Sequence, residues 1–152
     1  MVARESRAER LRREVHINVL LASGRFSEGM DQVCRTEGIS QAQYVVLWVL
    51  CLSDDAATGL PTGAVADGLI NRASDVTRLV DRLEKAGLVE RRPNPDDRRG
   101  VLVRATAEGA KVFRKVEPRM RAFHRAEWAG LSAAELETLH RLLGKALVAL
   151  DP

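Results

Sequence analysis

The sequence predicts a mainly α-helical chain with one small β-hairpin, and three observations support this fold class. Apolar residues recur at steps of three and four near both ends of the chain, which indicates long amphipathic helices. The nearly all-apolar segment 44–52 is about half as long as a membrane span and is typical of a buried helix. Residues 88–92 and 100–106 are strand-like and enclose a proline-rich turn, which indicates the hairpin. At 152 residues, the chain is expected to form one domain.

The N-terminal helix is expected from about residue 6 to residue 36, and Gly38 would end it. Its apolar face consists of residues at helical spacing: Ala8, Leu11, Val15, Val19, Ala22, Phe26, Met30 and Val33. A second helix is expected over 41–53, because Ser40 and Gln43 can form a capping box that satisfies free backbone amides. Since this helix is apolar on nearly all sides, it is expected to be central.

The next segment predicts a helix-turn-helix followed by the hairpin. Residues 53–63 are expected to form a turn-rich loop, and Thr62 can cap a short helix that ends near Leu69. A second helix follows up to Lys85, with Gly87 as its C-terminal stop. Its apolar stripe consists of Val76, Leu79, Val80 and Leu83. Because the hairpin comes directly afterwards, the segment is predicted to be a winged helix-turn-helix.

The polar face of this second helix is the main candidate binding surface. Placing the apolar stripe inward leaves the other residues outward or on the flanks. The candidates are Arg72, Ser74, Asp75, Thr77, Arg78, Arg82 and Lys85. One interpretation is a solvated face held by pairs such as Asp81 with Lys85. The short helix before it and the arginine-rich hairpin after it favour another interpretation, a helix that enters the major groove of DNA.

The tip of the hairpin is the second candidate binding surface, through Asp97, Arg98 and Arg99. Arginine suits a duplex because its planar guanidinium can bond two acceptors on guanine and is attracted to a narrow minor groove. An aspartate beside such an arginine can orient the guanidinium. The alternative is a flexible, solvated hairpin tip without a partner.

Two further helices are expected after the hairpin. The first runs from Thr106 to about residue 129, and the sequence SAAE at 132–135 forms a capping box that begins the second. In this last helix, leucines follow a nearly heptad seam: Leu136, Leu139, Leu143, Leu147 and Leu150. A seam of this kind is typical of a helix that packs against another helix.

The segment VTRLVDRLEKAGLVERRPNPDDRRGVLV, followed by ATAEG, resembles the MarR-type (multiple-antibiotic-resistance regulator) family of bacterial transcription factors. The resemblance covers nearly the whole chain and implies a homodimer that binds double-stranded DNA. It places the recognition helix at Ala73–Lys85, a base or phosphate contact at Arg78, and the family's D-x-R wing at Asp97 with Arg99. It also implies one domain, 1–152, in which 1–37 and 106–152 form a helical dimerisation lobe and 38–105 form the DNA-binding lobe.

The resemblance also implies an effector site, because members of this family often respond to small aromatic acids, other phenolic compounds or oxidants. Residues that can line a cleft between the two lobes are His16, Tyr44, Trp48, His124 and Trp128. The alternative for each of them is ordinary packing. Cys34 and Cys51 are candidates for a redox pair, but Cys51 lies in an apolar run that disfavours a reactive thiolate.

Composition and motifs exclude several other functions. The histidines have no metal-ligand spacing, and no nucleophile, P-loop or dinucleotide motif occurs, so we expect no metal, no cofactor and no enzyme activity. With no signal peptide or membrane span, a cytoplasmic protein without a membrane partner is expected. The leading hypothesis is a ligand-responsive repressor that binds a pseudo-palindromic operator. The alternative is a winged helix that docks on an acidic protein.

Overall fold

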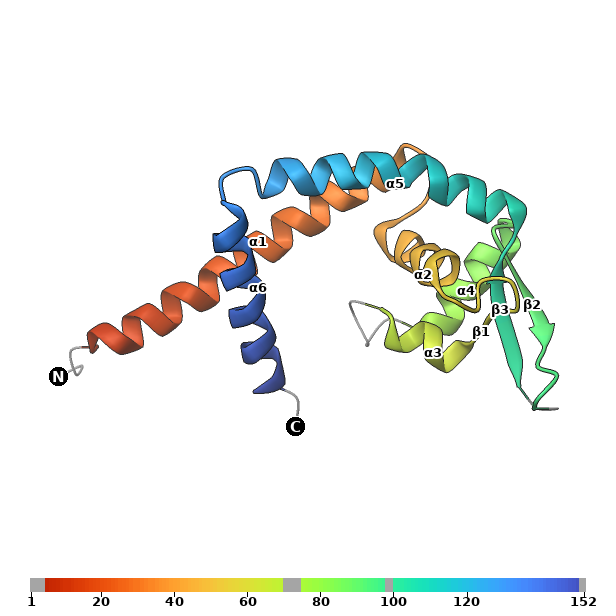
Figure 1. The fold of residues 1–152 in the computed structure, drawn as a ribbon, viewed down its shortest axis with the longest axis horizontal. Helices are drawn as coiled ribbons and strands as arrows, with labels where there is room; N and C mark the ends of the chain where they lie inside the picture. The colour runs from red at the N-terminus through yellow and green to blue at the C-terminus, as the bar shows by residue number, and fades with distance from the viewer. Residues whose placement is uncertain (1–4, 70–74, 98–99, 151–152) are drawn as a thin grey trace.

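The computed structural model describes residues 5–69, 75–97 and 100–150. This part of the chain contains six helices and three strands (Figure 1). In order they are α1 (Arg7–Arg35), α2 (Gln41–Leu52), β1 (Leu60–Pro61), α3 (Thr62–Asp67), α4 (Val76–Lys85), β2 (Val89–Pro93), β3 (Val101–Ala105), α5 (Ala107–Glu127) and α6 (Ala133–Val148). The predicted fold class, mainly α-helical with a small hairpin, is confirmed.

The helix starts at α2 and α6 follow the predicted capping chemistry. At α2, Ser40 accepts a hydrogen bond from the amide of Gln43, and the Gln43 side chain accepts one from the amide of Ser40. Ser132 and Glu135 form the same arrangement at α6. Each box satisfies two backbone amides that would otherwise have no partner at the helix start. The predicted cap at Thr62 is wrong, because Thr62 is the first helical residue of α3 and Pro61 precedes it without a side-chain cap.

The sheet has a strand that the sequence did not predict. Its order is β1-β3-β2, with both pairs antiparallel. Strand β1 lies in the segment expected to be a loop, and it pairs Leu60 with Val103 and Pro61 with Leu102. A two-residue strand is too short to show the alternation of apolar and polar residues by which strands are recognised.

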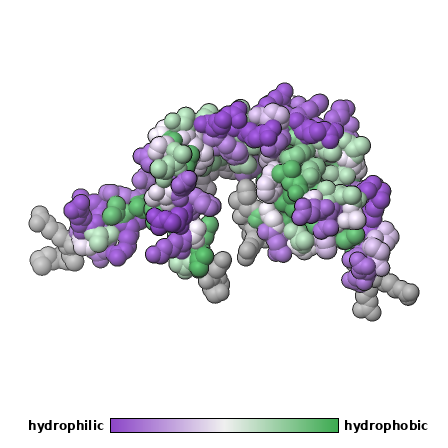
Figure 2. All heavy atoms as spheres, viewed as in Figure 1, coloured by the Kyte–Doolittle hydropathy of each residue, from purple (hydrophilic) through white to green (hydrophobic). Residues whose placement is uncertain are grey.

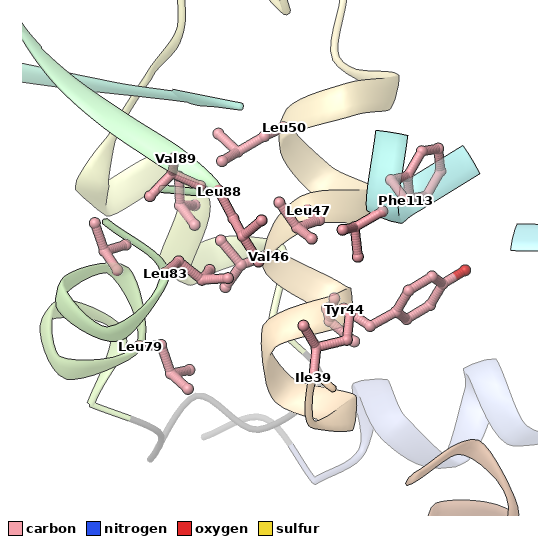
Figure 3. Close-up of a cluster of buried hydrophobic side chains, with 14 of the residues drawn as sticks. Ile39, Tyr44, Val46, Leu47, Leu50, Leu79, Leu83, Leu88, Val89 and Phe113 are labelled. Atoms are coloured by element: carbon pink, nitrogen blue, oxygen red, sulfur yellow. The ribbon is translucent and has the colours of Figure 1, made fainter. Parts of the chain in front are cut away.

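The hydrophobic core gathers around α2, as its apolar sequence predicts. Val46, Leu47 and Leu50 of α2 are buried together with Leu83 of α4 and Val89 of β2 (Figure 3). Val103 of β3 and Val116 of α5 are also fully buried. The stripe of α4 therefore faces α2 and the sheet, which leaves its polar face available.

Close backbone approach joins α5 to the turn between α4 and β2. The amide of Thr106 donates to the carbonyl of Leu88 at 3.0 Å, and its hydroxyl donates to the carbonyl of Gly87 at 2.6 Å. Gly109, one turn into α5, packs so tightly that a Cβ there would overlap the carbonyl oxygen of Leu88. This junction between α5 and the turn therefore requires glycine at position 109.

The outer parts of α1 and α6 lie away from the core (Figure 1). Within Ala133–Val148, all of which the structure describes, no residue is buried, and within Arg7–Arg35 only Cys34 is. Hydrophobic residues consequently reach the surface on both helices (Figure 2). Those exposed include Leu11, Val15, Leu20, Leu21, Leu142, Leu147 and Val148. None of the described helices combines the length and the hydropathy that crossing a membrane requires.

Candidate nucleic-acid interface

Helix α4 presents a polar, mainly basic face beside the hairpin. Leu79, Val80 and Leu83 are buried on one side, as predicted. On the other side, the side chains at four predicted positions are exposed: Thr77, Arg78, Arg82 and Lys85. A helix with one face packed on the core and cations on the other can lie against an anionic surface.

Asp75 has a structural role that the sequence analysis did not assign to it. Its carboxylate caps the start of α4 by accepting from the amide of Arg78 at 3.2 Å, and it lies 3.0 Å from Nε of the same arginine. The prediction that the recognition helix begins at Ala73 is therefore wrong, since the cap fixes its start at Val76. The aspartate therefore contacts the Nε side of the Arg78 guanidinium, and the Arg78 side chain is 78% exposed.

Asp81 does not pair with Lys85, the pair that the alternative interpretation of a solvated helix face offered. Asp81 instead contacts Arg91 of β2, with 2.6 Å between Oδ1 and Nη2. Glu84 contacts the same guanidinium and also accepts from the amide of Arg91 at 3.2 Å. Among the residues that the structure describes, Arg82 and Lys85 have no ion-pair partner, so these two cations of α4 remain available to a ligand.

The hairpin carries the predicted wing and closes through backbone bonds at its tip. The amide of Asn94 donates to the carbonyl of Gly100 at 3.0 Å, and the amide of Gly100 donates to the carbonyl of Asp97 at 2.9 Å. The side chain of Asn94 accepts from the amide of Asp96. These bonds shape the turn at which the predicted wing residues stand.

Four of the predicted DNA-contacting residues lie outside the described residues: Arg72, Ser74, Arg98 and Arg99. Their roles remain predictions from the sequence. Asp97 is described and exposed, at the turn where the hairpin reverses.

Not every hairpin arginine points to solvent. Arg104 contacts Glu90 on the paired strand and donates to the carbonyl of Ala57 at 3.0 Å. The hydrogen bond from Arg104 lowers the pKa of Glu90 below its usual value. Spacing along the chain did not predict the pairings of Arg104 and Arg91.

Tyr44 and Trp48, two of the five proposed effector-site residues, lie in different environments. Tyr44 is buried and donates its hydroxyl hydrogen to Glu117 at 2.5 Å. Burial, followed by the contact with Glu117, raises the pKa of Tyr44 far above its usual value. Trp48 is instead 44% exposed. Tyr44 therefore links α2 to α5 as a packed core residue.

The remaining three proposed effector-site residues are also dispersed. His16 is exposed on α1, and Nδ1 of His124 lies 3.1 Å from Glu127. Trp128 packs against Phe26, with ring centroids 4.8 Å apart, and lines a groove of about 630 Å³ between α1 and α6. A second cavity, of about 310 Å³, is lined by none of the five. Neither cavity brings together more than one of these residues within a single subunit.

The described residues contain no cluster of side chains that could hold a metal ion. Both cysteines also lack the features of a reactive thiol. Cys34 is buried, which raises its pKa to about 11, and burial also raises the pKa of Cys51. A raised pKa leaves little thiolate at neutral pH, so neither thiol is activated for nucleophilic or redox chemistry.

Comparison with known proteins shows a similarity to the MarR family. A sequence profile of the MarR family matches residues 64–101, a segment that includes α4 and β2. The transcriptional repressor IacR of Pseudomonas putida is 26% identical to this chain, over 79% of this chain and 70% of the relative. The multiple antibiotic resistance protein MarR of Salmonella typhimurium is 42% identical, over 47% of this chain and 51% of the relative.

A solved structure extends the similarity to most of the fold. A variant of MarR from Escherichia coli, in complex with operator DNA, is 28% identical, with a TM-score of 0.78. The match covers 88% of this chain and 94% of that one. These similarities support a MarR-family transcriptional regulator. They agree with the resemblance carried by the α4 and hairpin sequence, and IacR is itself a transcriptional repressor.

Proposed function

We propose that this MarR-family chain represses transcription by binding an operator with α4 and the hairpin tip. The observation that carries this proposal is the exposed basic face of α4, with Arg78, Arg82 and Lys85, directly beside the hairpin. The repressor IacR and the operator-bound MarR structure support the same activity. In the proposed complex, α4 lies in the major groove and Arg98 and Arg99 reach the backbone or the adjoining minor groove.

The regulator acts as a homodimer in this proposal. The exposed apolar residues of α1 and α6 support it, because apolar surface on this scale is uncommon on a monomer and typical of an interface. Residues 1–37 and 106–152 form the dimerisation lobe, and residues 38–105 form the DNA-binding lobe. Two-fold symmetry then requires a pseudo-palindromic operator whose half-sites lie about 10 base pairs apart.

The proposal includes a small aromatic or phenolic effector and a cytoplasmic location. An effector acts on such a dimer by changing the distance between its two recognition helices. Within one subunit, Trp128 is the only one of the five proposed effector-site residues among the described groove-lining side chains. A site formed by His16, Tyr44, Trp48, His124 and Trp128 would therefore need the second subunit or a rearrangement.

The first experiment is selection of bound fragments from sheared genomic DNA of the host, followed by gel-shift assays on the selected sequence. Arg78→Ala is expected to weaken operator binding by about 1–3 kcal/mol and to relax specificity at the base it contacts. Arg99→Ala is expected to weaken binding to all sequences and to flatten its salt dependence. Arg35→Ala, which removes an exposed cation at the end of α1, is the control. Selection of no DNA, or equal binding by all variants, would overturn the proposal.

A further inference from the structure

Arg91 joins the recognition helix to the hairpin by contacts that no other described residue makes. Its guanidinium contacts Asp81 and Glu84, which lie one turn apart on α4. Its own amide donates to Glu84 at 3.2 Å, so both the backbone and the side chain of Arg91 are held by one carboxylate. With a side chain only 27% exposed, Arg91 lies between the two elements and not on the outer surface of the hairpin.

The two carboxylates that Arg91 contacts lie on one flank of α4. A helix turns by about 100° per residue, so Asp81 and Glu84 form one flank, adjacent to β2. Arg78, Arg82 and Lys85 lie further round, on the exposed face. The basic face and the clamped flank are therefore adjacent strips of the same short helix, and the carboxylates that Arg91 contacts lie on the flank.

An ordinary surface ion pair would contribute little, because two flexible side chains in water lose about as much entropy as they gain in attraction. Arg91 differs in three respects. It is partly buried, its planar guanidinium bonds two carboxylates at once, and it starts from a strand whose backbone is fixed by pairing with Val103. Such a contact restricts the angle between α4 and the hairpin.

We propose that Arg91 is a positioning residue that holds the hairpin at a fixed angle to α4, so that helix and tip contact one duplex together. This inference rests on the proposed function, because the angle matters only if both elements bind the same DNA. Arg91 itself does not touch the nucleic acid. A fixed angle favours operators in which the groove and the backbone present their contacts at the matching distance, so Arg91 contributes to specificity more than to affinity.

The experiment compares Arg91→Ala with a charge-matched control, Arg92→Ala. Arg92 precedes the same tip, is 49% exposed and pairs only with Glu90 of its own strand, among the described residues. Both variants lose one positive charge, so any general loss of attraction to DNA is common to both. Melting temperature and circular dichroism confirm that each variant is folded, and Arg91→Lys provides a second, milder variant that keeps the charge but cannot bond both carboxylates with a planar fork.

Arg91→Ala is expected to lower the ratio of operator affinity to non-specific affinity about tenfold, whereas Arg92→Ala changes this ratio less than about twofold. In the absence of DNA, hydrogen exchange at the amides of residues 89–92 should become faster in Arg91→Ala and not in Arg92→Ala. A purely local ion pair would change neither measurement. Equal ratios and equal exchange in the two variants would overturn the proposal.

A third variant separates positioning from simple charge masking. In Arg91→Ala with Asp81→Asn and Glu84→Gln, the carboxylates can no longer repel the phosphates. If Arg91 positions the hairpin, this triple variant recovers non-specific affinity for DNA, but its ratio of operator affinity to non-specific affinity stays low. Recovery of the ratio would show that Arg91 only neutralises the two acids, and would overturn the positioning role. If the unaltered chain selects no DNA, the proposed function fails first. If it binds and only the Arg91 effects are absent, the positioning inference alone fails.

Discussion

The part of the chain around α2 and the part formed by α1 and α6 bury their apolar residues in different ways. Around α2, large side chains such as Leu47 and Leu83 are fully buried within one subunit. On α1 and α6, comparable side chains stay exposed, for example Leu20 at 59% and Leu147 at 64%. The comparison teaches that hydrophobic spacing identifies a packed face equally well in both parts, but does not tell whether the packing partner lies in the same chain.

The largest expected effect comes from the α2 core. Leu47→Ala should lower the free energy of unfolding by about 2–5 kcal/mol, because it removes a fully buried side chain and leaves a cavity. Urea denaturation followed by circular dichroism measures this change. A loss below about 1 kcal/mol would mean that the core is looser than its burial indicates.

The counterpart on α6 tests whether its exposed leucines are covered by a second subunit. Leu147→Ala should weaken dimerisation by about 1.5–3 kcal/mol per subunit, the value of burying one leucine side chain. Sedimentation equilibrium measures the dissociation constant, with Glu137→Ala on the same helix as the control. Unchanged association in the Leu147 variant would remove α6 from the proposed interface.

A smaller effect is expected at the junction between α5 and the turn that joins α4 to β2. Gly109→Ala should destabilise the fold by about 1–3 kcal/mol, because the added Cβ overlaps the carbonyl of Leu88 and must push α5 away from the α4–β2 turn. Gly63→Ala on α3, where a Cβ meets nothing within 4 Å, serves as the control and should be neutral or stabilising. Thermal melts of both variants test this prediction. Equal melting temperatures for Gly109→Ala and Gly63→Ala would show that α5 is not tightly packed against the turn.

A further prediction, which needs no loss of stability, concerns Cys34 at the end of α1 that reaches the core. Because burial raises its pKa from 9.0 to about 11, its thiolate fraction at pH 8 is about a hundredfold below that of the unfolded chain. In a Cys51→Ala background, iodoacetamide should therefore alkylate the folded protein much more slowly than the urea-unfolded protein. Raising the pH towards 11 should reduce the difference in alkylation rate between the folded and the unfolded protein. Similar rates at pH 8 would show that this end of α1 is open.

Sequence patterns predicted those features that depend on neighbouring residues. The apolar stripe of α4, the capping boxes at Ser40 and Ser132, and the stop at Gly87 all follow from local chemistry, and Gly87 has the positive φ that such a stop requires. Strand β1 was missed because it depends on pairing with β3, not on its own two residues.

The candidate site was predictable in its location but not in its internal contacts. The exposed side chains of Arg78, Arg82 and Lys85 follow from the helical period. The contacts of Arg91 with Asp81 and Glu84 do not, because they depend on how the hairpin lies against α4. The same limit explains the effector prediction, since Tyr44 packs in the core while Trp128 lines the α1–α6 groove.

The central claim is that a two-fold pair of these chains binds one duplex through α4 and the hairpin tip. Hydroxyl-radical footprinting on a DNA fragment selected by the protein tests this claim most directly. Two protected segments are expected, related by the pseudo-palindrome and about 10 base pairs apart, and protection of both should weaken together in Arg78→Ala. A single protected segment without symmetry, or a footprint that Arg78→Ala leaves unchanged, would contradict it.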